Sequence, residues 1–124
     1  MAETGNSILI VEDDLLLSRY YYTLVRQLGY EVCGSAQTAD EAVALALGHL
    51  PGVILMDVRL PGDRDGIDAA NEIHGSRPET KIVYITGSGE PETINRINQD
   101  HPAAILMKPI AAIQLQQVLG RVLH

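Results

Sequence analysis

The sequence predicts an α/β fold in which five parallel strands form one doubly wound sheet with five helices. Five short runs are apolar at successive positions, as in strands that are buried on both faces of a parallel sheet. Longer segments with the period of a helix lie between these runs, so five strand–helix units follow one another along the chain. Such a sheet binds its ligands at the carboxyl ends of its strands, near the point where the strand order reverses.

Each element is placed by its own pattern. The strands are expected at residues 7–12, 30–36, 52–57, 81–86 and 103–107. The helices are expected at residues 14–28, 39–50, 66–75, 90–99 and 110–123. Gly29 can end the first helix, Thr38 with Glu41 can cap the second, and Pro91 fits the first turn of the fourth.

Length and composition limit the protein class. At 124 residues with 46% hydrophobic content, the chain fits one domain, residues 1–124, with a tail at residues 1–6. The formal net charge of -7 disfavours nucleic acid and anionic membranes as partners. The single Cys33 is interpreted as a small buried residue, and the opening MAETGNS does not resemble a signal peptide. We expect a cytoplasmic protein without a membrane span, either a monomer or a weak dimer.

Acidic residues follow two of the apolar strands. Glu12, Asp13 and Asp14 come after the first strand, and Asp57 ends the third. Two carboxylates about 4 Å apart repel each other by about 4 kcal/mol at an effective dielectric constant of about 20, so this cluster calls for a cation or a proton. Oxygen ligands favour Mg²⁺, whereas the His and Cys residues that zinc prefers are scattered. The second strand ends without an acid, so we expect the first and third strands to be neighbours in the order 2-1-3-4-5.

A hydroxyl and an amine follow the last two strands. Thr86 closes the fourth strand, and Lys108 comes after the fifth. A metal ion with these two groups opposite it makes a site for a phosphoryl group, whose oxygens would be neutralised and hydrogen-bonded there. Asp57 ends a strand that is apolar up to its last residue, so it is the best candidate for a nucleophile that forms an aspartyl phosphate.

Four motifs, ILIVEDD, VILMDVRLPG, YITGS and MKP, occur in this order along the chain. Together they resemble the receiver domains of two-component response regulators across nearly the whole sequence. By this resemblance Asp13 is a direct magnesium ligand, Glu12 acts through water, and the carbonyl group of Arg59 is a further ligand. The resemblance also makes Asp57 the phospho-acceptor and metal ligand.

The same resemblance assigns the remaining motif residues. Thr86 would be the switch hydroxyl and Lys108 the lysine that contacts the phosphate, with Pro109 after it in a cis peptide bond. Asp14 would be the first residue of the helix. Arg59 would either cover the phosphoryl group or pair with Asp63 or Asp65, and Ser88 occupies a second position that tunes hydrolysis in the family.

The family implies a signalling phospho-acceptor rather than an enzyme with a separate substrate. A receiver takes a phosphoryl group from a phosphohistidine on a histidine kinase or a histidine phosphotransfer protein. It holds the group as an acyl phosphate, hydrolyses it slowly and changes conformation meanwhile. Because the chain ends after its last helix without an output segment, we expect a stand-alone receiver.

Two positions depart from the family pattern. Ile105 stands where most receivers have an aromatic residue that moves with the switch hydroxyl, and the loop after Asp57 is one residue longer than usual. Tyr84 lies two residues before Thr86 and therefore on the same side of its strand. We expect Tyr84 either to take over part of this coupling, as in a Thr-Gly subgroup of receivers, or to be a core tyrosine with a hydrogen-bonded hydroxyl.

The first helix offers a docking surface. Its helical period places Leu15, Arg19, Tyr22 and Arg26 on the stripe opposite the core. We hypothesise that Leu15 and Tyr22 anchor the phosphohistidine partner, because this helix commonly meets that partner in the family. The alternative is that they are ordinary scattered apolar residues of a protein surface.

Three other functions remain open at this point. A flavodoxin-like electron carrier would need a hydroxyl- and glycine-rich loop after the first strand, where the acids would repel phosphate. A haloacid-dehalogenase-type phosphatase would carry its nucleophile there in an Asp-x-Asp pattern. A receiver that is never phosphorylated would not need an intact acidic pocket. The four histidines, His49, His74, His101 and His124, are interpreted as solvated or loop residues rather than phosphohistidines.

Overall fold

The computed structural model describes residues 7–123, and the expected tail at residues 1–6 and His124 lie outside this range. Its strands are β1 (Ser7–Val11), β2 (Glu31–Ala36), β3 (Val53–Asp57), β4 (Lys81–Thr86) and β5 (Ala104–Met107). Its helices are α1 (Leu15–Gln27), α2 (Ala39–His49), α3 (Gly66–Ser76), α4 (Pro91–Asn98) and α5 (Ala112–Val122). All strands pair in parallel in the order β2-β1-β3-β4-β5, which confirms the predicted fold class and strand order.

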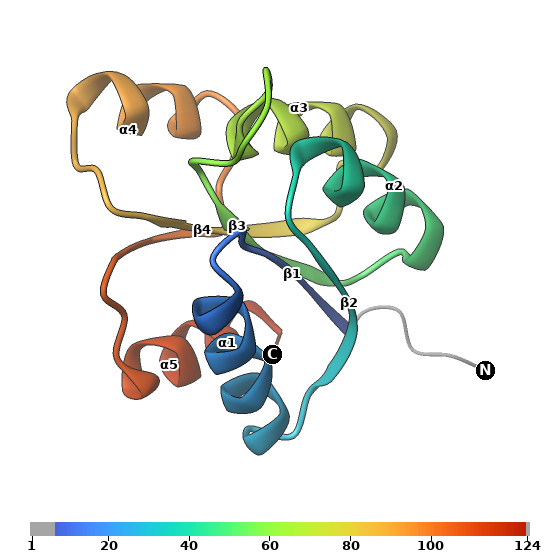
Figure 1. The fold of residues 1–124 in the computed structure, drawn as a ribbon, viewed down its shortest axis with the longest axis vertical. Coiled ribbons are helices and arrows are strands. Elements are labelled where there is room, and N and C mark those ends of the chain that lie inside the picture. The colour runs from blue at the N-terminus through green and yellow to red at the C-terminus, as the bar shows by residue number, and fades with distance from the viewer. Residues whose placement is uncertain (1–6, 124) are drawn as a thin grey trace.

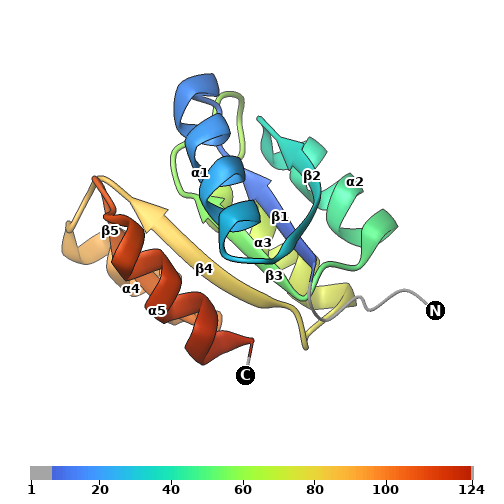
Figure 2. The same ribbon diagram turned by 90° about the horizontal axis from the view of Figure 1, so that it is seen from below.

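The helices cover both faces of the sheet. Helices α1 and α5 lie on one face, and α2, α3 and α4 lie on the other (Figure 1 and Figure 2). Alternate residues of the central strands point to opposite sides, so Met56 and Tyr84 pack under the three helices while Leu55 and Ile85 face α1 and α5. Every residue of β3 is buried, as its apolar sequence predicts for a strand covered on both faces.

The first helix begins one residue later than predicted. Asp14 has an extended backbone, and its carboxylate accepts hydrogen bonds from the amides of Leu16 at 2.9 Å and Leu17 at 3.2 Å. It is therefore the N-cap of α1 and not its first helical residue, because a side chain can reach these free N–H groups only from outside the helix. The last helix likewise begins at Ala112 instead of residue 110.

The other predicted helix bounds differ by at most one residue from those observed, and the predicted capping and stop residues are confirmed. The Thr38 hydroxyl accepts a hydrogen bond from the Glu41 amide at 3.1 Å, and Pro91 is the first residue of α4. Gly29 follows α1 with a φ of 96°, a left-handed conformation that glycine adopts without a steric cost.

Polar side chains tie α3 to α4 and to the segment after it. Arg96 of α4 donates to Asp65, the N-cap of α3, at 2.7 and 3.3 Å, and lies 3.4 Å from Asp68. His74 of α3 lies 2.7 Å from Asp100, which follows α4. These contacts hold two neighbouring helices together above the sheet.

The expectation that His74 is a solvated or loop residue is wrong. Its side chain is only 10% exposed, and its two ring nitrogens contact the Asp100 carboxylate and, at 2.8 Å, the carbonyl oxygen of Thr80. These partners are distant in sequence or belong to the backbone, so the local pattern does not reveal them. His49 and His101 are exposed, as expected.

Charge is distributed unevenly between the two faces. Helices α1 and α5 contain arginines and no acidic residue, namely Arg19, Arg26 and Arg121. All of the acids within helices belong to the opposite face, namely Asp40, Glu41, Asp68, Glu72 and Glu92. Within residues 7–123, no helix combines the length and apolarity that a membrane crossing requires.

We predict that Asp65→Ala lowers the free energy of unfolding by about 1 to 2 kcal/mol, because it removes both a capping carboxylate and the partner of Arg96. Urea unfolding followed by circular dichroism measures this loss. The matched control is Asp63→Ala in the same loop, since Asp63 is exposed and we expect almost no effect there. Equal losses in the two variants would contradict the assignment.

Candidate functional site

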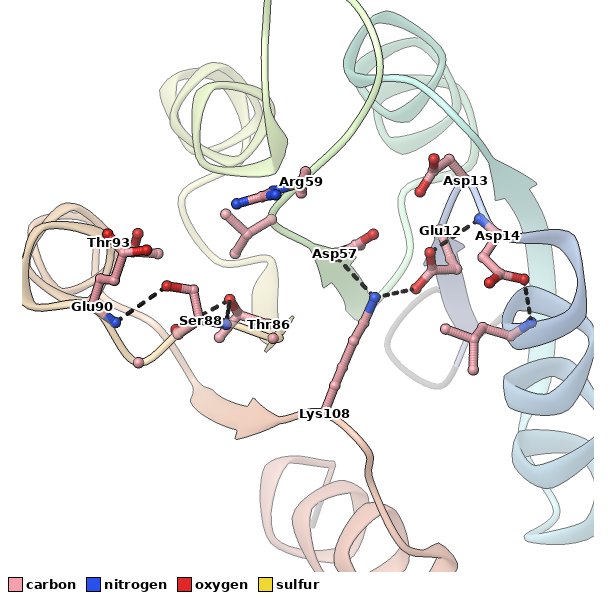
Figure 3. A pocket seen from close by; sticks show the side chains of 14 residues that line it. Glu12, Asp13, Asp14, Asp57, Arg59, Thr86, Ser88, Glu90, Thr93 and Lys108 are labelled. Atoms are coloured by element: carbon pink, nitrogen blue, oxygen red, sulfur yellow. Dashed lines mark hydrogen bonds and ion pairs between the residues drawn. The ribbon is translucent and has the colours of Figure 1, made fainter.

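The predicted site residues meet in one pocket at the carboxyl ends of the strands (Figure 3). The pocket has a volume of about 770 Å³ and lies between the ends of β1, β3, β4 and β5. Its lining includes Glu12, Asp13, Asp57, Arg59, Thr86, Ser88 and Lys108. These residues converge because carboxyl ends of parallel strands share one edge of the sheet.

Three carboxylates of this pocket form a compact oxygen cluster. One oxygen from each of Glu12, Asp13 and Asp57 lies within 4.8 Å of the others. Glu12 and Asp57 are buried and Asp13 is exposed, so the cluster opens to solvent on one side. An all-oxygen set with an open side fits Mg²⁺, which takes one or two carboxylates and keeps several waters. Asp14 is turned away from this cluster because it caps α1.

Burial makes the charge of Asp57 costly. Removal from water and the nearby Glu12 carboxylate raise the pKa of Asp57 to about 7, although Lys108 acts in the opposite direction. The Lys108 ammonium lies 3.1 Å from Glu12 and 3.3 Å from Asp57, between the two acids. Burial alone would lower the pKa of Lys108, but these carboxylates outweigh it and raise that pKa. Lys108 therefore supplies the cationic charge that partly compensates the acids in this conformation.

Thr86 lies at the end of β4 with its hydroxyl engaged by the following loop. Its oxygen accepts a hydrogen bond from the Ser88 amide at 3.0 Å and donates to the Ser88 carbonyl oxygen at 3.3 Å. Figure 3 shows Thr86 beside Ser88, at the end of the strand next to the one that carries Asp57. The hydroxyl is therefore positioned at the pocket but is occupied by the loop that leads to α4.

Arg59 borders the pocket without a fixed partner. No ion pair within residues 7–123 involves its guanidinium group, which Figure 3 shows above the cavity. The proposed pairing with Asp65 is wrong, since Arg96 holds that carboxylate at 2.7 Å. Arg59 thus remains available to cover a group bound below it.

Two neighbours of the site were not assigned by the sequence. A Cβ added to Gly66 would lie 2.0 Å from the carbonyl oxygen of Asp57, so only glycine fits beside the end of β3. Burial raises the pKa of Tyr21 in α1 to about 12, although the charge of Lys108 acts in the opposite direction.

Comparison with known proteins identifies the family of the chain. The family model of the response regulator receiver domain matches residues 8–120. The chain belongs to the response regulator receiver domain family. This membership excludes the flavodoxin and phosphatase interpretations of the fold. The bond between Lys108 and Pro109 is cis, as the resemblance implied.

The similarity extends to individual receivers and their structures. The transcriptional regulatory protein PdtaR of Mycobacterium tuberculosis is 38% identical over 114 residues, which cover 92% of this chain and 55% of PdtaR. The chemotaxis protein CheY of Thermotoga maritima is 27% identical, with 95% of this chain and 98% of CheY covered. A CheY-like receiver domain from Methanospirillum hungatei superposes with a TM-score of 0.89 at 29% identity, covering 95% of this chain and 93% of that one. The chain spans about half the length of PdtaR and of several other curated relatives.

We predict that Asp57→Asn stabilises the protein in magnesium-free buffer, and more so at high pH. The pKa of Asp57 is raised from 3.8 to about 7. Between these values the folded wild type binds more protons than the unfolded chain, so its stability falls as pH rises. Since Asn does not titrate, we expect Asp57→Asn to exceed wild type by on the order of 2 kcal/mol at about pH 8, and by much less at about pH 4.

Urea unfolding in EDTA at the two pH values measures this difference. Asp13→Asn is the matched control, because Asp13 is exposed and its charge is not penalised by burial. A gain for Asp57→Asn that is independent of pH would contradict the assignment. Added Mg²⁺ should raise the stability of wild type more than that of Asp57→Asn.

Proposed function

We propose that this receiver domain accepts a phosphoryl group on Asp57 from a phosphohistidine and releases it by slow hydrolysis. The observation that carries the proposal is the buried Asp57 carboxylate at the end of β3, in a carboxylate cluster and 3.3 Å from a lysine ammonium. A buried nucleophile beside a cation in an open pocket suits transfer of an anionic group. The same arrangement has no evident use in a purely structural domain.

The transfer is a displacement at phosphorus. One carboxylate oxygen of Asp57 forms a bond to phosphorus while the bond between phosphorus and the donor imidazole nitrogen breaks. The acyl phosphate is lost when a water oxygen attacks the same phosphorus, the bond to Asp57 breaks and inorganic phosphate leaves. The carboxylate is thereby restored, so the domain is a signalling phospho-acceptor with its own autophosphatase chemistry.

The remaining site residues bind and orient the group. Lys108 would exchange its contact with Asp57 for a phosphoryl oxygen, and Thr86 would turn from Ser88 to donate a hydrogen bond to another oxygen. Glu12, Asp13, Asp57 and the carbonyl of Arg59 would hold Mg²⁺, which when bound neutralises negative charge on the transferring group.

Access of water sets how long the acyl phosphate persists. The guanidinium group of Arg59 and the side chain of Ser88 border the same cavity. A guanidinium group that lies over the phosphoryl oxygens would restrict the approach of water from that side. Both residues are therefore assigned to the rate of hydrolysis.

The phosphohistidine partner is a histidine kinase or a histidine phosphotransfer protein, and we place its docking surface on α1. Leu15 is 65% exposed and Tyr22 is 46% exposed, in a protein where most large apolar side chains are buried. Leu16 and Tyr20 are exposed as well, and neither was predicted to belong to this surface. The arginines of α1 favour a partner with an apolar centre and acidic groups around it. We further assign the domain to the cytoplasm, as a monomer or weak dimer.

Incubation with a small phosphodonor such as acetyl phosphate tests the acceptor. We expect intact mass spectrometry to show one added phosphoryl group on wild type with Mg²⁺, and none on Asp57→Asn or in EDTA. Lys108→Met should fold and bind Mg²⁺ but accept the group at least about 10-fold more slowly, since the cation that contacts the phosphoryl oxygens is lost. Labelling of Asp57→Asn to the wild-type level would refute the assignment.

Substitutions on α1 test docking separately from chemistry. We expect Leu15→Ala and Tyr22→Ala each to slow transfer from a phosphorylated partner protein by about 5- to 30-fold, and to leave labelling by acetyl phosphate unchanged. Leu47→Ala is the matched control, because Leu47 is an exposed leucine on α2 at the other face of the sheet. Equal slowing with both donors would show that these residues act on the site instead of the partner.

A further inference from the structure

Tyr84 contains a buried hydroxyl group without a hydrogen-bond partner. The side chain is fully buried in the core under α3 and α4, and no residue within 7–123 bonds its oxygen. Nearly all buried polar groups in folded proteins are hydrogen-bonded, and an unpaired one is costly because it has lost its water. The expectation that the Tyr84 hydroxyl is hydrogen-bonded in the core is therefore wrong for this conformation. The unpaired hydroxyl destabilises this conformation relative to one in which it has a partner.

Charged groups that could bond this hydroxyl are close but engaged with one another. Burial raises the pKa of Tyr84, and so do the charges of Asp100 and Asp65, whereas Arg96 acts against them. Arg96 is instead paired with Asp65, and Asp100 with His74. Because the Arg96 side chain is 46% exposed, its ion pairs contribute little to stability and can be exchanged cheaply.

The helix that carries Arg96 is the one most easily displaced. Ile97 is the only buried residue of α4. The N-cap residue of this helix, Glu90, makes no side-chain hydrogen bond to the first turn. The loop that leads into α4 is held by the two hydrogen bonds between Thr86 and Ser88. A turn of the Thr86 hydroxyl toward Asp57 would break both bonds and free the start of this helix.

We propose that the Tyr84 hydroxyl is unpaired when Asp57 is free and gains a partner from the Arg96 and Asp65 pair when Asp57 is phosphorylated. This inference rests on the proposed function of Asp57. Tyr84 is then a positioning residue, because it favours the conformation in which Thr86 has turned and α4 has moved. Its neighbour across the sheet, Ile105, has no polar group that could do this.

Tyr84→Phe removes only the hydroxyl and tests the proposal. Beryllofluoride with Mg²⁺ serves as the probe for the phosphorylated state. We expect Tyr84→Phe to raise the Tm of the free protein by about 4 °C and to leave the Tm of the loaded protein unchanged or lower. By linkage, the apparent affinity for beryllofluoride should fall by about fivefold.

Tyr30→Phe is the matched control, since Tyr30 is a half-buried tyrosine that packs on the other face of the sheet. It should change both Tm values equally and leave the affinity for beryllofluoride unaltered. A second variant, Arg96→Met, should weaken beryllofluoride binding in wild type and have no further effect in Tyr84→Phe.

The following results for Tyr84→Phe or wild type would contradict the inference. A free Tyr84→Phe protein with an unchanged or lower Tm would show that the hydroxyl is already bonded, for instance by water. Equal rises in both states would show that it stays unpaired throughout. Failure of wild type to bind beryllofluoride would refute the proposed function itself, whereas normal binding by wild type with no change in Tyr84→Phe would refute this inference alone.

Discussion

Repulsion between carboxylates at one edge of the sheet is the constraint on which the rest of the structure depends. Glu12 and Asp57 are buried beside each other, and Asp13 adds a third oxygen donor. Strands with apolar residues on both faces are needed to bring these acids together, and burial in turn makes each negative charge more costly. The Lys108 ammonium lies between two of the acids and balances part of that charge. If a cation and a phosphoryl group bind, the cation would neutralise the carboxylates, and Lys108 would contact the phosphoryl oxygens instead of Asp57.

The two faces of the sheet serve different purposes around this edge. On one face α1 presents exposed apolar and cationic side chains next to the pocket. On the other face α4 is attached through exposed ion pairs and a single buried residue, Ile97. Strand β4 joins the pocket to this weakly attached helix, since Thr86 lines the cavity and Tyr84 lies beneath α3 and α4. Strand β4 is thus a short, continuous connection between the end of β3 at Asp57 and the surface formed by α4.

Most of the fold and the candidate site could be predicted because both depend on regular patterns. Apolar runs and helical periods specify the parallel sheet, and a parallel sheet gathers Asp57, Thr86 and Lys108 at one edge without further information. Contacts between residues far apart in sequence could not be predicted in this way. The bond between His74 and Asp100 joins residues 26 positions apart, so nothing near His74 distinguishes it from a solvated histidine.

The sequence pattern also could not predict the exposure and hydrogen bonding of individual side chains. The helical period of α1 showed that Leu15 is exposed but not that Leu16 is more so, because exposure depends on what the neighbouring loops cover. The period of β4 placed Tyr84 on the correct side of the sheet and said nothing about a partner for its hydroxyl. Such details require the positions of atoms from several elements at once.

Helices α1 and α5 contain arginines and no acids, whereas α2, α3 and α4 together contain five acids and one arginine, Arg96, and this imbalance contributes an electric dipole. Helices α1 and α5 form its positive pole, while the negative pole lies over α2 and α3. In the field of an approaching acidic surface, this dipole would rotate the domain so that α1 leads, although its net charge of -7 opposes close approach. Orientation by the dipole and repulsion by the net charge would depend differently on ionic strength. Salt would therefore change the encounter rate of this domain without altering any contact in the final complex.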